Sequence, residues 1–413
     1  MAFVFQLRGV SKTESKEICK RYTKEFKRKD NFHTAVCGLF LDIIYLYFDN
    51  DKTKLYKLFF PVIMANFTEK GSIHSVIEEY RESKNLYSWS YTYRILNMVG
   101  KDDGLEIGRI FRKLLLKLMK NAAFKNKGYC VAADITAKPF YGDKNLLMVK
   151  ECKRKAGTNY AIQYLTASIV EEGVRFNLLC LPIPSLASVV GKFEQMIREI
   201  RKLVPIKLLF LDRGFGNKEY SRVLGLLCHK YIMPITRNHK LKEIELCMKE
   251  QSTIKDDEYC VSILDYTFSE DRPKEYQLKV RLIIVQDKDD VFFFITNMYN
   301  LSMRQYYLLS ETYKYRFGIE TNYRVDNIFS PFTCSTKAAL RYLLMQMSLI
   351  AQDLWAFVNF ISHKKGKRQP RERFKKGRSV MDIVRARIRD LGYTWRPVIT
   401  AVQFKRKIDK ILG

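Results

Sequence analysis

The order of strand-forming and helix-forming segments after Gly128 constrains the fold more than any other feature of this sequence. Three segments rich in β-branched and aromatic residues come first, and helical periodicity then alternates with short apolar runs. We expect strands at 129–134, 160–170, 174–181, 206–211 and 231–235, and helices at 186–203 and 217–228. This β-β-β-α-β-α-β order predicts a mixed sheet with helices packed against it.

The three-strand opening is similar to the ribonuclease-H-like arrangement, so the expected fold class is α/β with a ribonuclease-H-like mixed sheet core. Three further strands within 257–299 indicate an inserted β subdomain, and helices are expected at 302–325 and 336–361. We therefore expect five regions: a helical region at 1–125, the first part of the core at 126–240, the β insertion at 241–300, the second part of the core at 301–362, and a basic segment with C-terminal helices at 363–413. The helical region has two open interpretations, DNA recognition and a cap on the core.

The charge balance predicts a polyanionic partner. The chain has 73 Lys and Arg residues against 44 Asp and Glu residues, which gives a net charge of +29. A whole-chain excess of this size favours nucleic acid over a small acidic substrate, which needs only a local basic pocket. Lys364, Lys365, Lys367 and Arg368 begin the most basic segment and are expected to contact backbone phosphates. A solvated, extended linker is the alternative for this segment.

The sequence predicts no membrane association. The longest stretch without a charged residue, 176–191, contains Pro182 and Pro184 and is shorter than the roughly 18 to 20 apolar residues of a membrane span. The first residues lack the pattern of a secretory signal, so we expect a cytoplasmic, nucleoid-associated protein. The nine cysteines include no Cys-x-x-Cys pair, which argues against structural zinc.

Two aspartates are candidates for metal ligands. Asp134 closes the first expected strand and Asp212 the fourth, and in a sheet of this order the two strands are neighbours about 4.8 Å apart. Both carboxylates should then emerge at one edge, where two Mg²⁺ ions need shared oxygen ligands and a third carboxylate. Taken singly, an Asp after a strand is more often a helix cap or turn former. Gly214 is expected to allow a sharp turn after Asp212, and Phe215 to anchor the loop.

The third carboxylate is expected on the helix that begins near residue 302. Tyr313, Arg316 and Glu320 lie along one face of that helix at 3.6 residues per turn. This spacing resembles the Tyr-Arg-Glu signature of DDE transposases encoded by bacterial and archaeal insertion sequences, in the group whose β insertion precedes the final Glu. Glu311 competes for the same role, but Tyr307 stands four residues before it where an Arg would be needed.

Other motifs are similar to those of the same family, and the similarity covers about 128–360. The segments 134–142 and 212–215 resemble its first and second Asp motifs, and Thr296 with Asn297 resembles a recurrent pair in its insertion. One position departs from the signature: the family has Lys seven residues after the Glu, and here that residue is Asn327. Arg324, one turn after Glu320, is the candidate for that phosphate contact.

The resemblance implies a transposase that cuts DNA at transposon ends and joins it to target DNA. Asp134, Asp212 and Glu320 would hold two Mg²⁺ or Mn²⁺ ions, water would attack the scissile phosphate, and the freed 3′ hydroxyl would attack the target. Double-stranded DNA is the implied partner, and the chain would act as a homodimer because two ends are handled together. The alternatives are a ribonuclease-H-like nuclease without transposition and an inactive DNA-binding relic.

The resemblance also implies DNA contacts beside the carboxylates. Tyr313 and Arg316 would grip the phosphate next to the cut, and Arg213 and Lys138 are further candidates. Packing against Tyr307 or Phe317 is the alternative for Tyr313, and an ion pair with Glu320 is the alternative for Arg316. The aromatic run 292–294 fits a buried strand better than a wedge for a flipped base.

Overall fold

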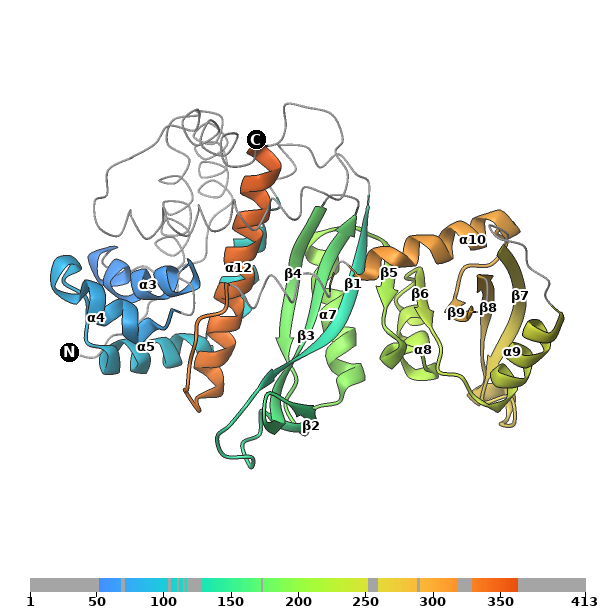
Figure 1. The fold of residues 1–413 in the computed structure, drawn as a ribbon, viewed down its shortest axis with the longest axis horizontal. Helices are drawn as coiled ribbons and strands as arrows, with labels where there is room; N and C mark the ends of the chain where they lie inside the picture. The colour runs from blue at the N-terminus through green and yellow to red at the C-terminus, as the bar shows by residue number, and fades with distance from the viewer. Residues whose placement is uncertain are drawn as a thin grey trace. The chain divides into compact units, whose positions relative to one another are not determined.

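The structure, a computed structural model, describes most of the middle of the chain. The described residues are 52–67, 71–102, 105–109, 111–113, 116, 128–171, 174–251, 259–287, 290–317, 319 and 329–362. The chain divides into two compact units, Met1–Lys125 with Tyr323–Gly413 and Asn126–Asn322 (Figure 1).

The first unit is helical in its described part. It contains α3 (Lys52–Phe67), α4 (Ile73–Lys84), α5 (Trp89–Asp102) and α12 (Ala338–Ser362). The helix α12 packs against α5 and α3, which explains why its apolar residues are buried. Residues 301–362, expected together as one part of the core, are thus divided: α12 belongs to this unit and residues up to 322 to the other. Among the described helices, none is both long and apolar enough to cross a membrane.

The second unit is built on one mixed sheet, which confirms the expected α/β class. Its strands are β1 (Tyr129–Pro139), β2 (Val149–Lys155), β3 (Thr158–Glu171), β4 (Val174–Pro182), β5 (Ile206–Leu211), β6 (Tyr231–Pro234), β7 (Tyr259–Phe268), β8 (Leu278–Asp287) and β9 (Asp290–Thr296). Within the described residues the sheet has nine strands in the order β2-β3-β1-β5-β6-β9-β8-β7, with β4 beside β3.

The parallel strand pairs lie in the middle of the sheet, with antiparallel pairs on both sides. The pairs β1–β3 and β3–β4 are antiparallel, whereas β5 runs parallel to β1 and β6 parallel to β5. The crossovers are the helices α7 (Val189–Leu203) and α8 (Lys218–Leu226), as parallel strands require. Phe193, Met196, Ile197 and Ile200 form the buried face of α7 at helical spacing. The sequence prediction located these strands and helices but missed β2.

The insertion, residues 241–300, continues the same sheet. Its last strand, β9, pairs antiparallel with β6 and joins β8 and β7 to the core. Side chains reinforce this junction: Thr296 Oγ1 donates to the Tyr231 carbonyl over 2.6 Å, and Asn297 Nδ2 donates to the His229 carbonyl over 2.8 Å. The Thr-Asn pair singled out in the sequence is therefore part of the junction between insertion and core.

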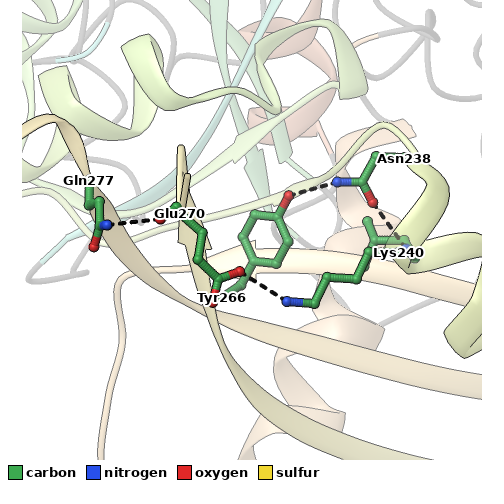
Figure 2. Close-up of polar contacts among 6 residues, drawn as sticks. Asn238, Lys240, Tyr266, Glu270 and Gln277 are labelled. Atoms are coloured by element: carbon green, nitrogen blue, oxygen red, sulfur yellow. Dashed lines mark hydrogen bonds and ion pairs between the residues drawn. The ribbon is translucent and has the colours of Figure 1, made fainter. Parts of the chain in front are cut away.

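The sequence prediction missed the helix α9 (His239–Gln251), which polar contacts tie to the β7–β8 hairpin (Figure 2). Asn238 accepts from the Leu241 amide over 3.0 Å and donates to the Tyr266 hydroxyl over 3.2 Å. Lys240 forms an ion pair with Glu270 at 3.0 Å. The two contacts to the hairpin are exposed and individually weak, but together they hold the start of α9 beside it.

Candidate active site

Asp134 and Asp212 stand at the point where the parallel pairing of β1 and β5 ends. The last paired residues are Ala133 and Leu211, and the next residue along each strand is an aspartate. Paired strands lie about 4.8 Å apart, so the two carboxylates leave adjacent backbone positions. The structure thus brings together the two residues that the sequence placed on neighbouring strands. Their chemical roles stay a prediction.

The expectation that β1 ends at Asp134 was wrong. The strand runs on to Pro139, because β3 continues to pair with it after β5 has ended. Asp134 is half-buried, and its Oδ1 accepts a 2.7 Å hydrogen bond from the amide of Ile135. The carboxylate therefore projects from a strand that is held on one side by β3, with Thr166 as the residue opposite.

Asp212 occupies a capping position without acting as a cap. It precedes the short 3₁₀ helix η1 (Arg213–Phe215), yet its side chain makes no capping hydrogen bond. The side chain is 44% exposed, which leaves the carboxylate accessible to a ligand. The loop that follows is anchored as expected: Phe215 is buried, with its ring centroid 5.5 Å from that of Phe193 and 5.0 Å from that of Tyr220.

The glycine required in this loop is Gly216, and the prediction of Gly214 was wrong. Gly214 has no positive φ, and a side chain at that position would meet no atom within 4 Å. A Cβ at Gly216 would instead collide with the backbone carbonyl oxygen of Pro234. The loop after Asp212 therefore lies directly against β6 through Gly216.

Tyr313 contacts the end of β5, next to Asp212. It follows α10 (Met303–Thr312) and begins the 3₁₀ helix η3 (Tyr313–Arg316). Its hydroxyl donates a 2.9 Å hydrogen bond to the carbonyl of Leu211, the residue before Asp212. Its ring packs against Phe210 and Phe294, at centroid distances of 6.2 and 5.1 Å. The Tyr313 hydroxyl is thus engaged with the backbone of the candidate site.

Burial holds Tyr313 in its neutral form. Desolvation is the largest cause of a strongly raised pKa; Arg316 opposes the rise, whereas the charges of Asp212 and Asp134 add to it. Both aspartates therefore lie within electrostatic reach of the same hydroxyl. The Tyr313 hydroxyl therefore stays protonated at neutral pH and can donate its hydrogen bond to the Leu211 carbonyl.

Arg316 places a buried positive charge beside Asp212. Its side chain is only 7% exposed, and Nη2 lies 3.6 Å from Asp212 Oδ1. The guanidinium also lies over the rings of Tyr313 and Phe317, at 5.7 and 5.1 Å from their centroids. In a 3₁₀ turn, residues three apart lie above one another, so Tyr313 and Arg316 share a side even though the expected α-helix is interrupted here.

The other predicted residues have different positions. Arg213 is exposed on η1, and Lys138 lies on β1, four residues after Asp134 and on the same face. Glu311 forms an ion pair with Lys314 at 2.7 Å. The remaining predicted residues lie outside the described part of the chain: Glu320, Arg324, Lys364, Lys365, Lys367 and Arg368.

The described donors are suited to a hard divalent cation but form an incomplete set. Asp134 and Asp212 offer carboxylate oxygens at adjacent strand ends, the ligand type that Mg²⁺ and Mn²⁺ prefer. No group of three His, Cys, Asp or Glu side chains able to hold a metal occurs among the described residues. A complete site of the predicted kind therefore needs a carboxylate from outside that part of the chain.

Comparisons with known proteins give distant structural similarity only. No protein-family profile and no curated protein sequence matches the chain. Among solved structures, it is similar to the piggyBac transposase in a synaptic complex with hairpin DNA, with a TM-score of 0.46 and 13% sequence identity, over 88% of this chain and 76% of that one. At this level of similarity, the function has to be inferred from the residues of this chain.

Proposed function

We propose that this protein is a DDE-type DNA transposase, which cleaves DNA at transposon ends and transfers the cut strand into target DNA. The observation that carries the proposal is the register of β1 and β5, whose pairing ends one residue before Asp134 and one residue before Asp212. The strand order β4-β3-β1-β5-β6 agrees with the proposed ribonuclease-H-like core, in which three antiparallel strands precede two parallel ones. Glu320 is the proposed third carboxylate.

The metal dependence of the reaction belongs to the proposal. Two Mg²⁺ or Mn²⁺ ions, held by Asp134, Asp212 and Glu320, would activate the attacking oxygen and stabilise the leaving oxygen of the phosphodiester. A water oxygen would first bond to the scissile phosphorus, and the bond from phosphorus to the 3′ oxygen would break. The 3′ oxygen would leave with a proton as a free 3′ hydroxyl, and the phosphate would stay on the 5′ end of the neighbouring nucleotide. That hydroxyl then attacks a target phosphate, and the displaced oxygen leaves with a proton.

Arg316 and Tyr313 have separate roles in this proposal. Arg316 carries a permanent charge beside Asp212, where it would contact a non-bridging oxygen of the phosphate. Tyr313 is a positioning residue, because its hydroxyl holds the carbonyl of Leu211 and so fixes the start of the loop that carries Asp212. Arg213 and Lys138 flank the two carboxylates and would extend the phosphate contacts.

The partner proposed is double-stranded DNA, bound by a homodimer. The net charge of +29 supplies the attraction to phosphate. A dimer would bring two transposon ends together, with one set of carboxylates for each end.

The test is metal-dependent nicking of duplexes made from the DNA that flanks the coding sequence. The full-length protein should nick near the ends of any inverted repeats in Mg²⁺ or Mn²⁺. Asp212→Ala should abolish nicking and retain DNA binding, because the carboxylate is 44% exposed and makes no capping hydrogen bond. Asp271→Ala, at an Asp whose side chain is 83% exposed in the insertion, is the matched control and should nick normally.

The third carboxylate is tested by a second pair of variants. Glu320→Gln should abolish nicking, whereas Glu311→Gln should retain it, because Glu311 already forms an ion pair with Lys314. Full nicking by Asp212→Ala or Glu320→Gln would disprove the assignment. Nicking without strand transfer into a second duplex would favour the nuclease alternative.

A further inference from the structure

One part of the sheet extends past the candidate active site. β1 continues from Ile135 to Pro139, where the described residues supply no partner on the side that β5 occupies earlier in the strand. β2 pairs with the first half of β3, from Val149 opposite Ile162 to Lys155 opposite Thr158. We call this three-stranded extension, residues 135–163 with its connecting loop, the flap. It projects away from β5 and β6 (Figure 1).

The flap is held in a defined shape. Its β2–β3 hairpin turns through Ala156 and Gly157, both with positive φ, at 50° and 84°, which matches the tight turns preferred in hairpins. The loop between β1 and β2 is fastened to this tip, because the Tyr141 hydroxyl donates a 2.6 Å hydrogen bond to the Ala156 carbonyl. Thr158 Oγ1 adds a 2.9 Å hydrogen bond to the Phe140 carbonyl. The flap therefore presents its side chains at fixed positions.

The flap is strongly basic, and most of its cations form no ion pair with a described residue. Six basic residues and two acidic ones lie between 138 and 157: Lys138, Lys144, Lys150, Lys153, Arg154 and Lys155 against Asp143 and Glu151. Four of these cations form no ion pair with any described residue: Lys144, Lys150, Lys153 and Arg154. On α7, by contrast, Arg198 and Lys202 each form an ion pair of 2.6 Å with a glutamate. The flap therefore presents an excess of positive charge to solvent.

We propose that the flap binds the phosphate backbone of the duplex DNA that leads away from the cut. This inference rests on the proposed function, which places the scissile phosphate at Asp134 and Asp212. Asp134 lies opposite Thr166 on β3, and Thr158, at the flap tip, is the eighth residue before Thr166. At 3.3 Å per residue, the tip is about 26 Å from the level of Asp134. Duplex DNA rises about 3.4 Å per base pair, so the flap spans about eight base pairs.

An exposed aromatic side chain strengthens this assignment. The ring of Tyr141 is 68% exposed although its hydroxyl is fixed to the flap tip. It lies in the same short loop as Lys144. An aromatic face between cations is suited to sugar and base contacts beside phosphates. The combination of exposed cations and an exposed aromatic ring fits a nucleic-acid duplex.

The experiment compares two triple variants of the full-length protein with equal loss of charge. One replaces Lys144, Lys153 and Arg154 of the flap by Ala, and the control replaces Lys192, Arg198 and Lys202 of α7 by Ala. The affinity for a duplex of about 30 base pairs is measured over a range of salt concentrations. The flap variant should bind at least about tenfold more weakly at 0.1 M salt, and its salt slope should fall by up to about 2.7, or roughly 0.9 per lost phosphate contact. The α7 variant should remain within about twofold of the wild type.

Duplex length provides an independent readout. Nicking by the flap variant should be impaired on a duplex that extends about 15 base pairs beyond the cut, and unimpaired on one that extends about four, which does not reach the tip. Equal affinities of the two triple variants, with circular dichroism confirming that both are folded, would overturn the proposal. So would a larger loss of affinity for RNA than for DNA.

The two proposals fail in different ways. If the wild type binds duplex DNA but never nicks it, the proposed function fails, and the affinity comparison still decides the role of the flap. If the wild type nicks and the flap variant matches the α7 variant on long duplexes, only the flap proposal fails.

Discussion

Two arginine–aspartate pairs in this protein differ in what surrounds them. In the helical unit, Arg112 and Asp353 lie 3.9 Å apart with side chains that are 0% and 1% exposed. In the sheet unit, Arg316 and Asp212 lie 3.6 Å apart, with Arg316 buried and Asp212 44% exposed. The first pair is closed to any ligand, and its charges are balanced only by protein. The second pair leaves one carboxylate open, and this difference separates a structural ion pair from a candidate site.

The largest expected effect is on activity at the open pair. Asp212→Asn should reduce nicking by about a thousandfold or more, because one carboxylate ligand is lost from a set that acts as a unit. The unfolding free energy should fall by about 1 kcal/mol, because the buried Arg316 loses the charge of a partner that is 44% exposed and caps no helix. Nicking rates and urea unfolding measure the two quantities. A large loss of stability would show that Asp212 has a structural role, and the two arginine–aspartate pairs would then not differ in function.

The closed pair should respond in the opposite way. Asp353→Ala leaves the Arg112 charge buried without its partner and should lower the unfolding free energy by about 3 to 5 kcal/mol. Nicking per folded molecule should persist at low temperature. The control replaces both residues, Arg112→Met with Asp353→Leu, and should recover most of the stability, because an apolar pair avoids the desolvation cost. Loss of nicking in the stable double variant would contradict a purely structural role.

A third prediction tests how the backbone positions Asp212. Gly216→Ala should destabilise the protein by about 1 to 3 kcal/mol, because its Cβ collides with the Pro234 carbonyl and the loop has to shift. Gly214→Ala is the matched control two residues earlier and should be nearly neutral, since a methyl group there meets no atom within 4 Å. Thermal unfolding ranks the two variants. Equal effects would mean that close packing against β6 does not set the loop position.

The smallest expected effect concerns Tyr313. Tyr313→Phe removes the hydrogen bond to the Leu211 carbonyl and should cost about 1 kcal/mol. If Tyr313 is a positioning residue, the maximal nicking rate should fall more than DNA affinity does. A selective loss of affinity would instead favour a direct DNA contact.

The same residue makes a prediction about pH. Burial raises the pKa of Tyr313 above its ordinary value near 10, and raises that of Tyr231 to about 12. A raised folded pKa means that the stabilisation is complete below pH 10 and is lost as the pH rises toward the folded value. The unfolding free energy should therefore decline above about pH 10, and Tyr313→Phe should make that decline shallower. An unchanged slope would contradict the burial of the hydroxyl.

Local pattern was enough to predict most strands and helices. The runs at β4 and β5 are apolar or β-branched and bounded by turn residues, so their limits could be predicted almost to the residue. β2 was missed because Val149–Lys155 is mostly charged and resembles a solvated loop; it forms a strand because it pairs with β3. α9 was missed because its apolar periodicity is weak, and contacts with the β7–β8 hairpin support it.

Only the part of the candidate site that depends on strand order could be predicted from the sequence. The expected sheet placed Asp134 and Asp212 on neighbouring strands, and they lie there in the structure. The contact of Arg316 with Asp212 joins residues about a hundred positions apart, so the sequence offered the local partner Glu320 instead. The choice between Gly214 and Gly216 depends on the position of Pro234 in β6, which spacing along the chain does not reveal.

The four-residue strand β6 has a consequence for synthesis of the chain. Its parallel partner, β5, precedes it closely, whereas its antiparallel partner, β9, follows more than sixty residues later, as in the pairing of Ile232 with Thr296. While the ribosome is still making the insertion, the edge of β6 that later pairs with β9 has no neighbouring strand. An unpaired apolar edge is a template for aggregation, so we expect the unfinished polypeptide to need a chaperone most between the synthesis of β6 and that of β9.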